Sequence, residues 1–261
     1  MRTLNLADRT VRAIGGVLIC LVFFPITASA QTSETAEEIM NRVDRLLRGD
    51  SSHGVARMEV VTENWERGLT MEIWSLGVDY SLVRVQAPAR EAGTATLKAA
   101  EDIWNYLPKV DRAIKIPASM MAGAWMGSHF TNDDLVKESQ LIEDYFIELT
   151  HDGDRDGVAV WEFRLTPKPE APVVWGHVEY QVRQADYMPL WTRFYDEDGE
   201  LARTMRYSEF TNLGGRIVPA VMEMVPADKP GETTKIIYEQ LLFDVDIGQS
   251  FFSLRNLQRG Q

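Results

Sequence analysis

Apolar and polar side chains alternate along most of the chain from Gly54 onward, and turn residues separate the alternating segments. Alternation with a period of two is typical of a strand that buries one face and exposes the other. The segments are Arg57–Glu63, Leu69–Leu76, Tyr80–Gln86, Thr94–Lys98, Ile103–Leu107, Ala113–Ile116, Tyr145–Thr150, Val158–Thr166, Gly176–Gln184, Leu190–Tyr195, Leu201–Phe210, Ile217–Val225 and Thr234–Phe243. The pattern predicts about a dozen strands and a mainly β fold.

Short turns join many of these segments, among them residues 152–157, 196–199 and 212–215, which are rich in Asp, Asn and Gly. Strands joined in this way pair with their chain neighbours as an antiparallel meander. We expect so wide a sheet to curl into an incomplete barrel, because twisted open sheets seldom exceed about ten strands. Trp161, Phe163 and Tyr180 belong to its apolar face, which predicts a cavity or an inserted plug.

One helix is predicted before the strands. Ala36, Ile39, Met40, Val43, Leu46 and Leu47 recur at spacings of three and four residues. Thr32 or Ser33 is predicted to cap its start, and Gly49 is predicted to end it. The helix has one apolar face to bury, so it is one of two candidate plugs.

The second candidate plug belongs to the stretch Trp104–Leu135. Its first half, which contains Trp104 and Tyr106, alternates around a Pro-containing turn, as a β-hairpin does. In its second half the period changes, and Met120, Met121, Trp125 and Met126 are spaced by Gly and Ala. Because Met side chains adapt to irregular apolar partners, we expect residues 117–136 to form a short, loosely held helical lid.

The N-terminus has the features of a Sec-type signal peptide. Three arginines precede an apolar run over residues 13–26, and Ala28-Ser29-Ala30 is a small-residue cleavage site. We expect residues 1–30 to be removed and residues 31–261 to form a single domain in the periplasm of a Gram-negative bacterium. Cys20 is not the expected acylation site of a lipoprotein, because bulky Ile19 precedes it. The mature chain would then contain no cysteine.

The charge of the chain disfavours some partners. The formal net charge is -12, and removing three Arg and one Asp with the signal peptide makes it -14. An acidic surface disfavours nucleic acid and anionic membranes as direct partners. The apolar run at the N-terminus is shorter than the roughly 20 residues that span a bilayer, and no later segment is a better candidate. We therefore expect a protein that is not integral to the membrane.

Catalytic and metal-binding patterns are weak. The four histidines, His53, His129, His151 and His177, are scattered, which argues against a zinc site. Ser128 is adjacent to His129 but there is no G-x-S-x-G motif, so a nucleophilic triad is not expected. We predict no catalytic residue, no enzymatic activity and no cofactor.

Two acidic motifs have structural interpretations. Asp152-x-Asp154-x-Asp156-Gly157 matches the opening of a calcium loop, but the twelfth position is Phe163 and a strand follows. A solvated hairpin turn is the favoured interpretation, and ion binding stays open. Asp133 and Asp134 follow Thr131, and the spacing of Thr131 and Asp134 predicts a capping box at the start of a short helix.

Several stretches resemble the periplasmic outer-membrane lipoprotein-sorting family, with its LolA/LolB-like fold. They are the amphipathic leading helix, residues 103–108 with the following Asp111-Arg112, residues 125–134, residues 163–168 and residues 196–199. The resemblance implies an incomplete antiparallel β-barrel of about eleven strands that holds acyl chains beneath helical lids. Acyl-chain contacts are then expected from Trp104, Tyr106, Met120, Met121, Trp125, Met126, Phe130, Trp161, Phe163 and Tyr180.

The residues and the resemblance together favour a carrier. Moving a lipid through water exposes its chains at a cost of about 0.8 kcal/mol per CH₂, which an enclosed apolar cavity removes. The expected cargo is an acylated lipoprotein or a lipid, and an inner-membrane transporter and an outer-membrane acceptor are possible partners. Two alternatives stay open: a free-lipid shuttle beside an inner-membrane exporter of the resistance-nodulation-division class, and a regulatory subunit that senses lipoproteins.

Overall fold

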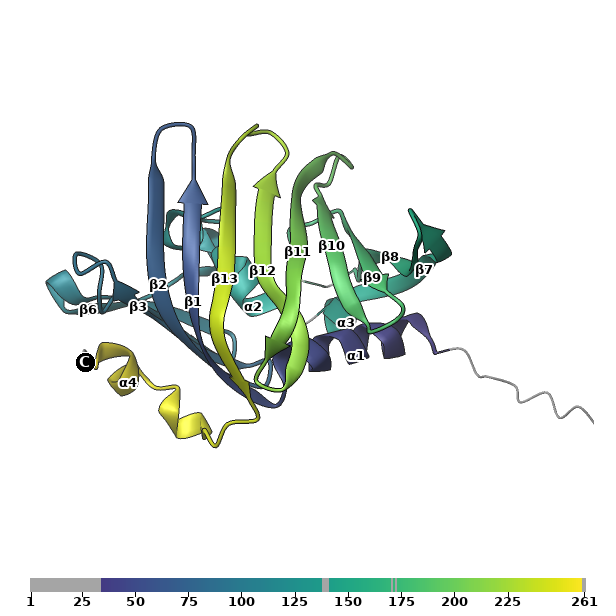
Figure 1. Cartoon of the computed structure of the whole chain (residues 1–261). Helices are drawn as coiled ribbons and strands as arrows, with labels where there is room; N and C mark the ends of the chain where they lie inside the picture. Colours follow the sequence, from purple (N-terminus) through teal and green to yellow (C-terminus); the bar gives the residue numbers. More distant parts are fainter. Residues whose placement is uncertain (1–33, 138–140, 170, 172, 260–261) are drawn as a thin grey trace, which may run out of the picture. The chain divides into compact units, whose positions relative to one another are not determined.

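A single antiparallel sheet organises the protein. The computed structural model describes residues 34–137, 141–169, 171 and 173–259. In the described residues the sheet has thirteen strands (Figure 1). They are β1 Ser51–Val61, β2 Glu66–Leu76, β3 Tyr80–Ala87, β4 Ala95–Ala99, β5 Asp102–Leu107, β6 Arg112–Lys115, β7 Tyr145–Arg155, β8 Val158–Pro167, β9 His177–Arg183, β10 Met188–Tyr195, β11 Leu201–Leu213, β12 Arg216–Pro226 and β13 Thr233–Phe243.

The strand order shows two meanders joined at the centre. From one edge to the other it is β6-β5-β4-β3-β2-β1-β13-β12-β11-β10-β9-β8-β7. The pairing of β1 with β13 joins the meanders, and there Met58 is opposite Ile236. The strands β6 and β7 are the two edges of this order, so the sheet is curved but open (Figure 1). The predicted mainly β, incompletely closed fold is confirmed, with thirteen strands instead of about eleven.

Eight helical elements accompany the sheet in the described residues: four α-helices and four 3₁₀ turns. The α-helices are α1 Ala36–Arg48, α2 Asn132–Lys137, α3 Leu141–Asp144 and α4 Leu254–Gln258. The 3₁₀ turns are η1 Pro108–Val110, η2 Ala118–Met120, η3 Trp125–Gly127 and η4 Gln249–Phe251. None of the described helices is long and apolar enough to cross a bilayer.

The register defines two faces. We call the face that bears Met58, Met71, Val83 and Met224 the inner face, because these side chains are buried in one continuous apolar cluster. The same face continues through Phe194 to a second buried cluster on β7, β8 and β9. The opposite face, the outer face, bears Leu82 and Leu97.

Helix α1 covers one end of the inner face. Its residues Ile39, Met40 and Val43 are buried against β7, β8 and β9. Thr35 is the N-cap, and it exchanges hydrogen bonds with Glu38 in a capping box. The predicted caps were wrong: Thr32 and Ser33 lie outside the described residues, and the helix begins after Thr35. The predicted end at Gly49 is confirmed, with a positive φ of 68°.

Helix α4 covers part of the outer face. Phe252 and Leu257 are buried there against Leu82, Leu97 and other side chains of β3, β4 and β5. The guanidinium of Arg84 donates to the carbonyl oxygen of Asn256 at 2.6 Å, which holds the end of α4 to the sheet. The outer face is therefore shielded from water between β3 and β6 by the C-terminal segment (Figure 1).

The structure also corrects one predicted turn. Strand β7 extends to Arg155, so Asp152 and Asp154 belong to a strand and only residues 156 and 157 form the turn. Asp156 and Gly157 both have positive φ, as a two-residue hairpin turn of the primed type requires. Asp152, Gly153 and Asp154 are residue types that are common in turns. The sequence therefore did not indicate that the strand continues through them.

The segment from residue 1 to residue 33 contains the predicted signal peptide and lies outside the described residues. The boundary between residues 30 and 31 and the single-domain organisation of 31–261 stay predictions. Residues 34–259, as far as they are described, belong to one compact unit.

Candidate functional site

A lid crosses the inner face and connects the two edges of the sheet. We define the lid as residues 117–136, which follow β6 and precede the segment that leads to β7. The predicted short helix is wrong for its first part, which forms the 3₁₀ turns η2 and η3. Only α2 is α-helical. Gly123 and Gly127 interrupt the segment, and Gly127 has a φ of 72°. These glycines favour turns over a continuous helix.

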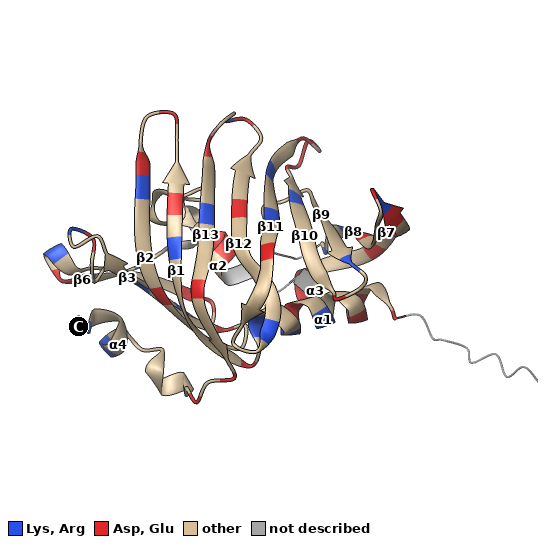
Figure 2. Ribbon diagram, viewed as in Figure 1, with Lys and Arg blue, Asp and Glu red and all other residues tan. Residues whose placement is uncertain are grey.

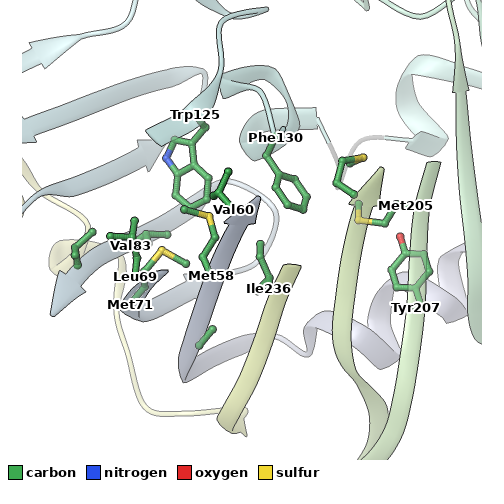
Figure 3. Close-up of a cluster of buried hydrophobic side chains, with 13 residues drawn as sticks. Met58, Val60, Leu69, Met71, Val83, Trp125, Phe130, Met205, Tyr207 and Ile236 are labelled. Atoms are coloured by element: carbon green, nitrogen blue, oxygen red, sulfur yellow. The ribbon is translucent and has the colours of Figure 1, made fainter. Parts of the chain in front are cut away.

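Two aromatic side chains of the lid enter the inner face. Trp125 is 3% exposed and Phe130 is 5% exposed. Figure 3 shows the indole of Trp125 above Met58 and Met71, and the ring of Phe130 directed towards the strand that carries Ile236. The backbone holds the two together, because the Trp125 N–H donates to the Phe130 carbonyl at 2.7 Å. Side chains of the lid therefore occupy the apolar inner face of the sheet.

Polar side chains on the inner face attach the lid. Thr96 of β4 accepts a hydrogen bond from the Trp125 indole N–H at 3.0 Å. Arg67 of β2 donates to the carbonyl oxygen of Met126 at 2.6 Å, and its guanidinium also pairs with Glu91. Each contact satisfies a polar group that would otherwise be costly to bury.

His129 attaches the lid at the centre of the sheet. Its backbone N–H donates to Thr234 Oγ1 at 3.0 Å, and its Nδ1 lies 2.8 Å from the same oxygen. Its Nε2 lies 2.9 Å from a carboxylate oxygen of Glu232. Because a carboxylate only accepts, Nε2 carries a hydrogen and donates it to Glu232. The hydrogen bond from His129 lowers the pKa of Glu232.

Asp134 forms a buried ion pair that attaches the lid to β11. Arg203 of β11 donates to Asp134 Oδ2 at 2.9 Å and also pairs through its second nitrogen with Oδ1. The Arg203 side chain is 6% exposed and the Asp134 side chain 13%. The guanidinium lies 4.5 Å from the ring centroid of Trp175 and 4.6 Å from that of Phe194. The pair is bidentate and lies between aromatic faces, which is a strong geometry.

The predicted capping box of α2 is confirmed. The Asp134 N–H donates to Thr131 Oγ1 at 3.2 Å, and the Thr131 N–H donates to Asp134 Oδ2 at 2.7 Å. Asp134 therefore caps its own helix and binds Arg203 with the same carboxylate. The sequence indicated the first role and contained no local signal for the second.

A small cavity lies between the lid and the second cluster. Its volume is about 50 Å³, well below the roughly 300–1,000 Å³ of typical ligand pockets. It is lined by Asp133, Asp134, Tyr145, Trp175, Val178, Tyr180, Thr192, Phe194, Met205 and Tyr207. Burial, followed by the charge of Asp144, raises the pKa of Tyr145, so its phenol stays protonated at neutral pH.

The structure brings together six of the predicted site residues. Trp125, Phe130 and half-buried Met126 lie in the first cluster, and Phe163, Tyr180 and half-buried Trp161 lie in the second. All six belong to the continuous inner face. Phe163 and Tyr180 are paired across β8 and β9, which gives the face a wall of aromatic rings at the end covered by α1.

The other four predicted residues lie elsewhere. Trp104 and Tyr106 face outward under α4, because Leu97 of the outer face pairs with Trp104. Met120 is 55% exposed and Met121 is half-buried. The alternation of apolar and polar residues indicated which residues share a face of β5. It did not indicate which face of the sheet the lid covers. Tyr106 has a different structural role, since its hydroxyl donates to Asp111 at 2.9 Å.

The polar attachments were missed by sequence reasoning. Arg67, Thr96, Arg203 and Thr234 occupy inward positions of their strands, where most neighbours are apolar. A polar residue in the apolar register of a strand was the available signal. Arg203 is the clearest case, because it shares one face of β11 with Met205 and Tyr207.

Metal-binding and calcium-loop residues do not converge. Over the described ranges, no group of three or more His, Cys, Asp or Glu side chains could hold a metal ion. Asp154 instead accepts a hydrogen bond from the Gly157 N–H at 3.0 Å, and Asp152 accepts one from Gln184 at 2.7 Å. These contacts belong to a hairpin and its neighbouring loop.

Comparisons with known proteins agree on the fold. A family model with the description "Uncharacterized protein" matches residues 77–259. No curated protein matches the chain. A domain described as an outer membrane lipoprotein-sorting protein, from Vibrio parahaemolyticus, is 23% identical with a TM-score of 0.76, covering 86% of this chain and 100% of that one.

Two further solved structures have the same architecture. A DUF1329 family protein from Desulfovibrio piger is 22% identical with a TM-score of 0.77, covering 85% of this chain and 97% of that one. A LolA superfamily protein from Nitrosomonas europaea is 24% identical with a TM-score of 0.72, covering 85% and 99%. At these identities the similarity shows the fold.

Proposed function

The chain belongs to the family whose model matches residues 77–259 and has a LolA-like fold, and from this premise we propose that it is a periplasmic carrier of acyl chains. The cargo is a lipoprotein or a lipid, and its acyl chains bind between the inner face and the lid. The main observation is a continuous apolar face covered by a separate segment that is attached through polar contacts.

The apolar area suits acyl chains. The two inner clusters join Met, Val, Leu and aromatic side chains over nine of the strands. Each methylene buried there gains about 0.8 kcal/mol relative to water. Flexible Met side chains such as Met58, Met71 and Met224 adapt to chains of different length and unsaturation.

The cavity beneath the lid is too small for such a chain, so binding at this site requires the lid to move. Trp125 and Phe130 occupy the apolar face, and an acyl chain would replace their contacts with its own. The polar attachments exchange with water at a modest cost, since a typical hydrogen bond contributes about 0.5–1.5 kcal/mol net. Cargo would thus compete with the side chains of the lid.

Quenching by a brominated fatty acyl chain tests the proposal. Bromine quenches the fluorescence of tryptophans that it contacts, so uptake beside Trp125 should quench the wild-type protein. Trp125→Phe should lose a large part of this quenching. Trp104→Phe is the matched control, because Trp104 lies on the outer face and should contribute little. Saturable binding without any quenching, or equal losses in both variants, would contradict binding at the inner face.

Identifying the molecule that copurifies with the protein tests which class of cargo it binds. Native mass spectrometry with lipid extraction, on protein purified from its own compartment, should detect either an acylated peptide or a free lipid. The acylated peptide assigns lipoprotein sorting between an inner-membrane transporter and an outer-membrane acceptor. Detection of a free lipid would support the free-lipid shuttle. An empty protein that also takes up no acyl probe would overturn the carrier proposal and leave lipoprotein sensing as the alternative.

A further inference from the structure

The end of the β5–β6 hairpin exposes apolar side chains. Leu107 is 40% exposed, Val110 in η1 is 59% exposed and Ile114 on edge strand β6 is 45% exposed. Met120, at the start of the lid, is 55% exposed. These four residues fall within a stretch of fourteen residues, residues 107–120. Single exposed apolar residues are ordinary, but a run of them at one sheet edge indicates a contact surface.

The charge of this region is opposite to that of the chain. The chain has 39 acidic and 27 basic residues, but residues 103–132 contain three basic residues and Asp111 as the one acidic residue. Those basic residues are Lys109, Arg112 and Lys115, and all three are exposed. Asp111 accepts the hydrogen bond of Tyr106, and Lys115 pairs with Asp102 at 2.7 Å.

Helix α4 adds further positive charge beside this edge. It contacts β6 and β4, and residues 247–259 contain Arg255 and Arg259 without an acidic residue. Leu254 on the same helix is 40% exposed. Figure 2 shows blue segments both at the β6 edge and on α4. Apolar and basic side chains are therefore interleaved over two neighbouring elements.

We infer that the end of the β5–β6 hairpin, residues 107–115, docks on the anionic headgroups of a lipid bilayer, with the positive charge of α4 beside it. Leu107 and Val110 would enter the interface between headgroups and acyl chains. Lys and Arg bind lipid phosphates with their charged ends while their methylene stems contact apolar groups. The aliphatic side chains stand at the end of a hairpin, which suits a deformable lipid surface better than a protein pocket.

The position of the surface suggests a role for membrane docking in cargo transfer. This role rests on the proposed carrier function. Strand β6 leads directly into the lid, and Met120 already belongs to it. A hairpin held at the bilayer would place the start of the lid next to the lipid phase, where an acyl chain leaves or enters water. Net charge alone predicted that anionic membranes are disfavoured partners. The docking inference departs from that prediction at this one edge, where the local charge is positive.

Vesicle cosedimentation tests the inference with the mature chain. The wild-type protein should sediment with vesicles of phosphatidylglycerol and phosphatidylethanolamine at low salt. It should stay in solution with phosphatidylcholine vesicles, and raised salt should release it from the anionic ones. The double variant K109E/R112E should lower partitioning at least tenfold, and Val110→Glu should lower it several-fold. Failure of the wild-type protein to bind anionic vesicles would overturn the inference.

The double variant R206E/K229E is the matched control, because it changes the net charge equally at residues outside this surface. Equal losses in both double variants would mean that total charge, not this surface, governs binding. Loss of binding to a purified membrane protein, with unchanged vesicle binding, would assign the surface to a protein partner and overturn the lipid assignment. Circular dichroism checks that each variant is folded.

The acyl-probe assay keeps this inference separate from the proposed function. K109E/R112E should take up a brominated acyl chain in vesicle-free solution as the wild-type protein does, because neither residue lies on the inner apolar clusters. Vesicle binding without acyl uptake would contradict the carrier proposal alone. Acyl uptake without vesicle binding would contradict the docking surface alone.

Discussion

At the scale of single residues, the lid is held by side chains that serve two partners each. Asp134 caps α2 through Thr131 and neutralises Arg203 on a distant strand. His129 binds Thr234 and Glu232 with its two ring nitrogens. A carboxylate or an imidazole that joins local and distant groups makes the lid position specific, since losing it leaves several buried polar groups without partners.

Asp134→Ala should destabilise the protein by about 3 kcal/mol, because it leaves the guanidinium of Arg203 buried without its anion. Urea denaturation measures this loss. Glu197→Ala, in an exposed turn, is the control and should change the stability by less than about 0.5 kcal/mol. A loss below about 1 kcal/mol for Asp134→Ala would show that the pair contributes little to holding the lid.

Lys98 predicts a pH dependence of stability. It is 3% exposed, its ammonium donates to the Val78 carbonyl, and burial lowers its pKa to about 8. The unfolded chain therefore binds more protons between pH 8 and pH 10.5, so folded stability rises with pH in that window. The rise is at most about 3 kcal/mol.

Lys98→Met should remove this rise, and the difference in unfolding free energy between variant and wild type should shrink as the pH increases from 8 to 10.5. Lys229→Met, at an exposed position, is the control for the titration of ordinary lysines. Parallel pH profiles for wild type and Lys98→Met would mean that Lys98 titrates normally in the folded protein.

At the scale of elements, the lid is a succession of turns that carries two aromatic plugs. Its 3₁₀ turns bury little besides Trp125, while α2 supplies Asp134. The strands beneath it are joined by ladders of backbone hydrogen bonds, whereas the lid is attached to them through side chains. Segments of this kind open at lower free energy than the sheet on which they lie.

Trp125→Ala should weaken the lid and enlarge the apolar space. We expect a loss of about 3 kcal/mol in stability and faster binding of a fluorescent acyl probe, since the probe no longer displaces the indole. Stopped-flow fluorescence measures the rate. Trp104→Ala removes an indole from the outer face and should destabilise without accelerating binding. Equal acceleration in the two variants would refute a plug role for Trp125.

At the scale of the whole described unit, the two meanders meet at β1 and β13 and end at β6 and β7. The central strands have partners on both sides and apolar clusters beneath them, whereas each edge strand has one partner. Stability is therefore graded from the centre of the sheet towards its edges. The lid connects the two weaker edges, so opening at either edge also loosens the lid.

Hydrogen exchange should reveal this gradient. Amides of β1, β13 and β12 should exchange most slowly, amides of β6 and the lid most rapidly, and bound acyl chains should slow exchange in the sheet beneath the lid. Mass spectrometry of peptides from the labelled protein measures both effects. Uniform protection across the sheet, or acyl-dependent changes confined to the outer face, would contradict the proposed site.

The sequence by itself determined the strands, the leading helix, most of the turns and the capping box of α2, because period, propensity and capping act over a few residues. Trp161, Phe163 and Tyr180 were correctly assigned to one apolar face for the same reason. Only the tertiary structure decided what covers each face. Pairing of β1 with β13 sets the sheet, and the paths of residues 117–136 and α4 then bury one face each. Trp104 and Tyr106 lie on the outer face and Arg203 meets Asp134 because these contacts join residues far apart in the chain, and alternation along a strand carries no information about which partner arrives on which side.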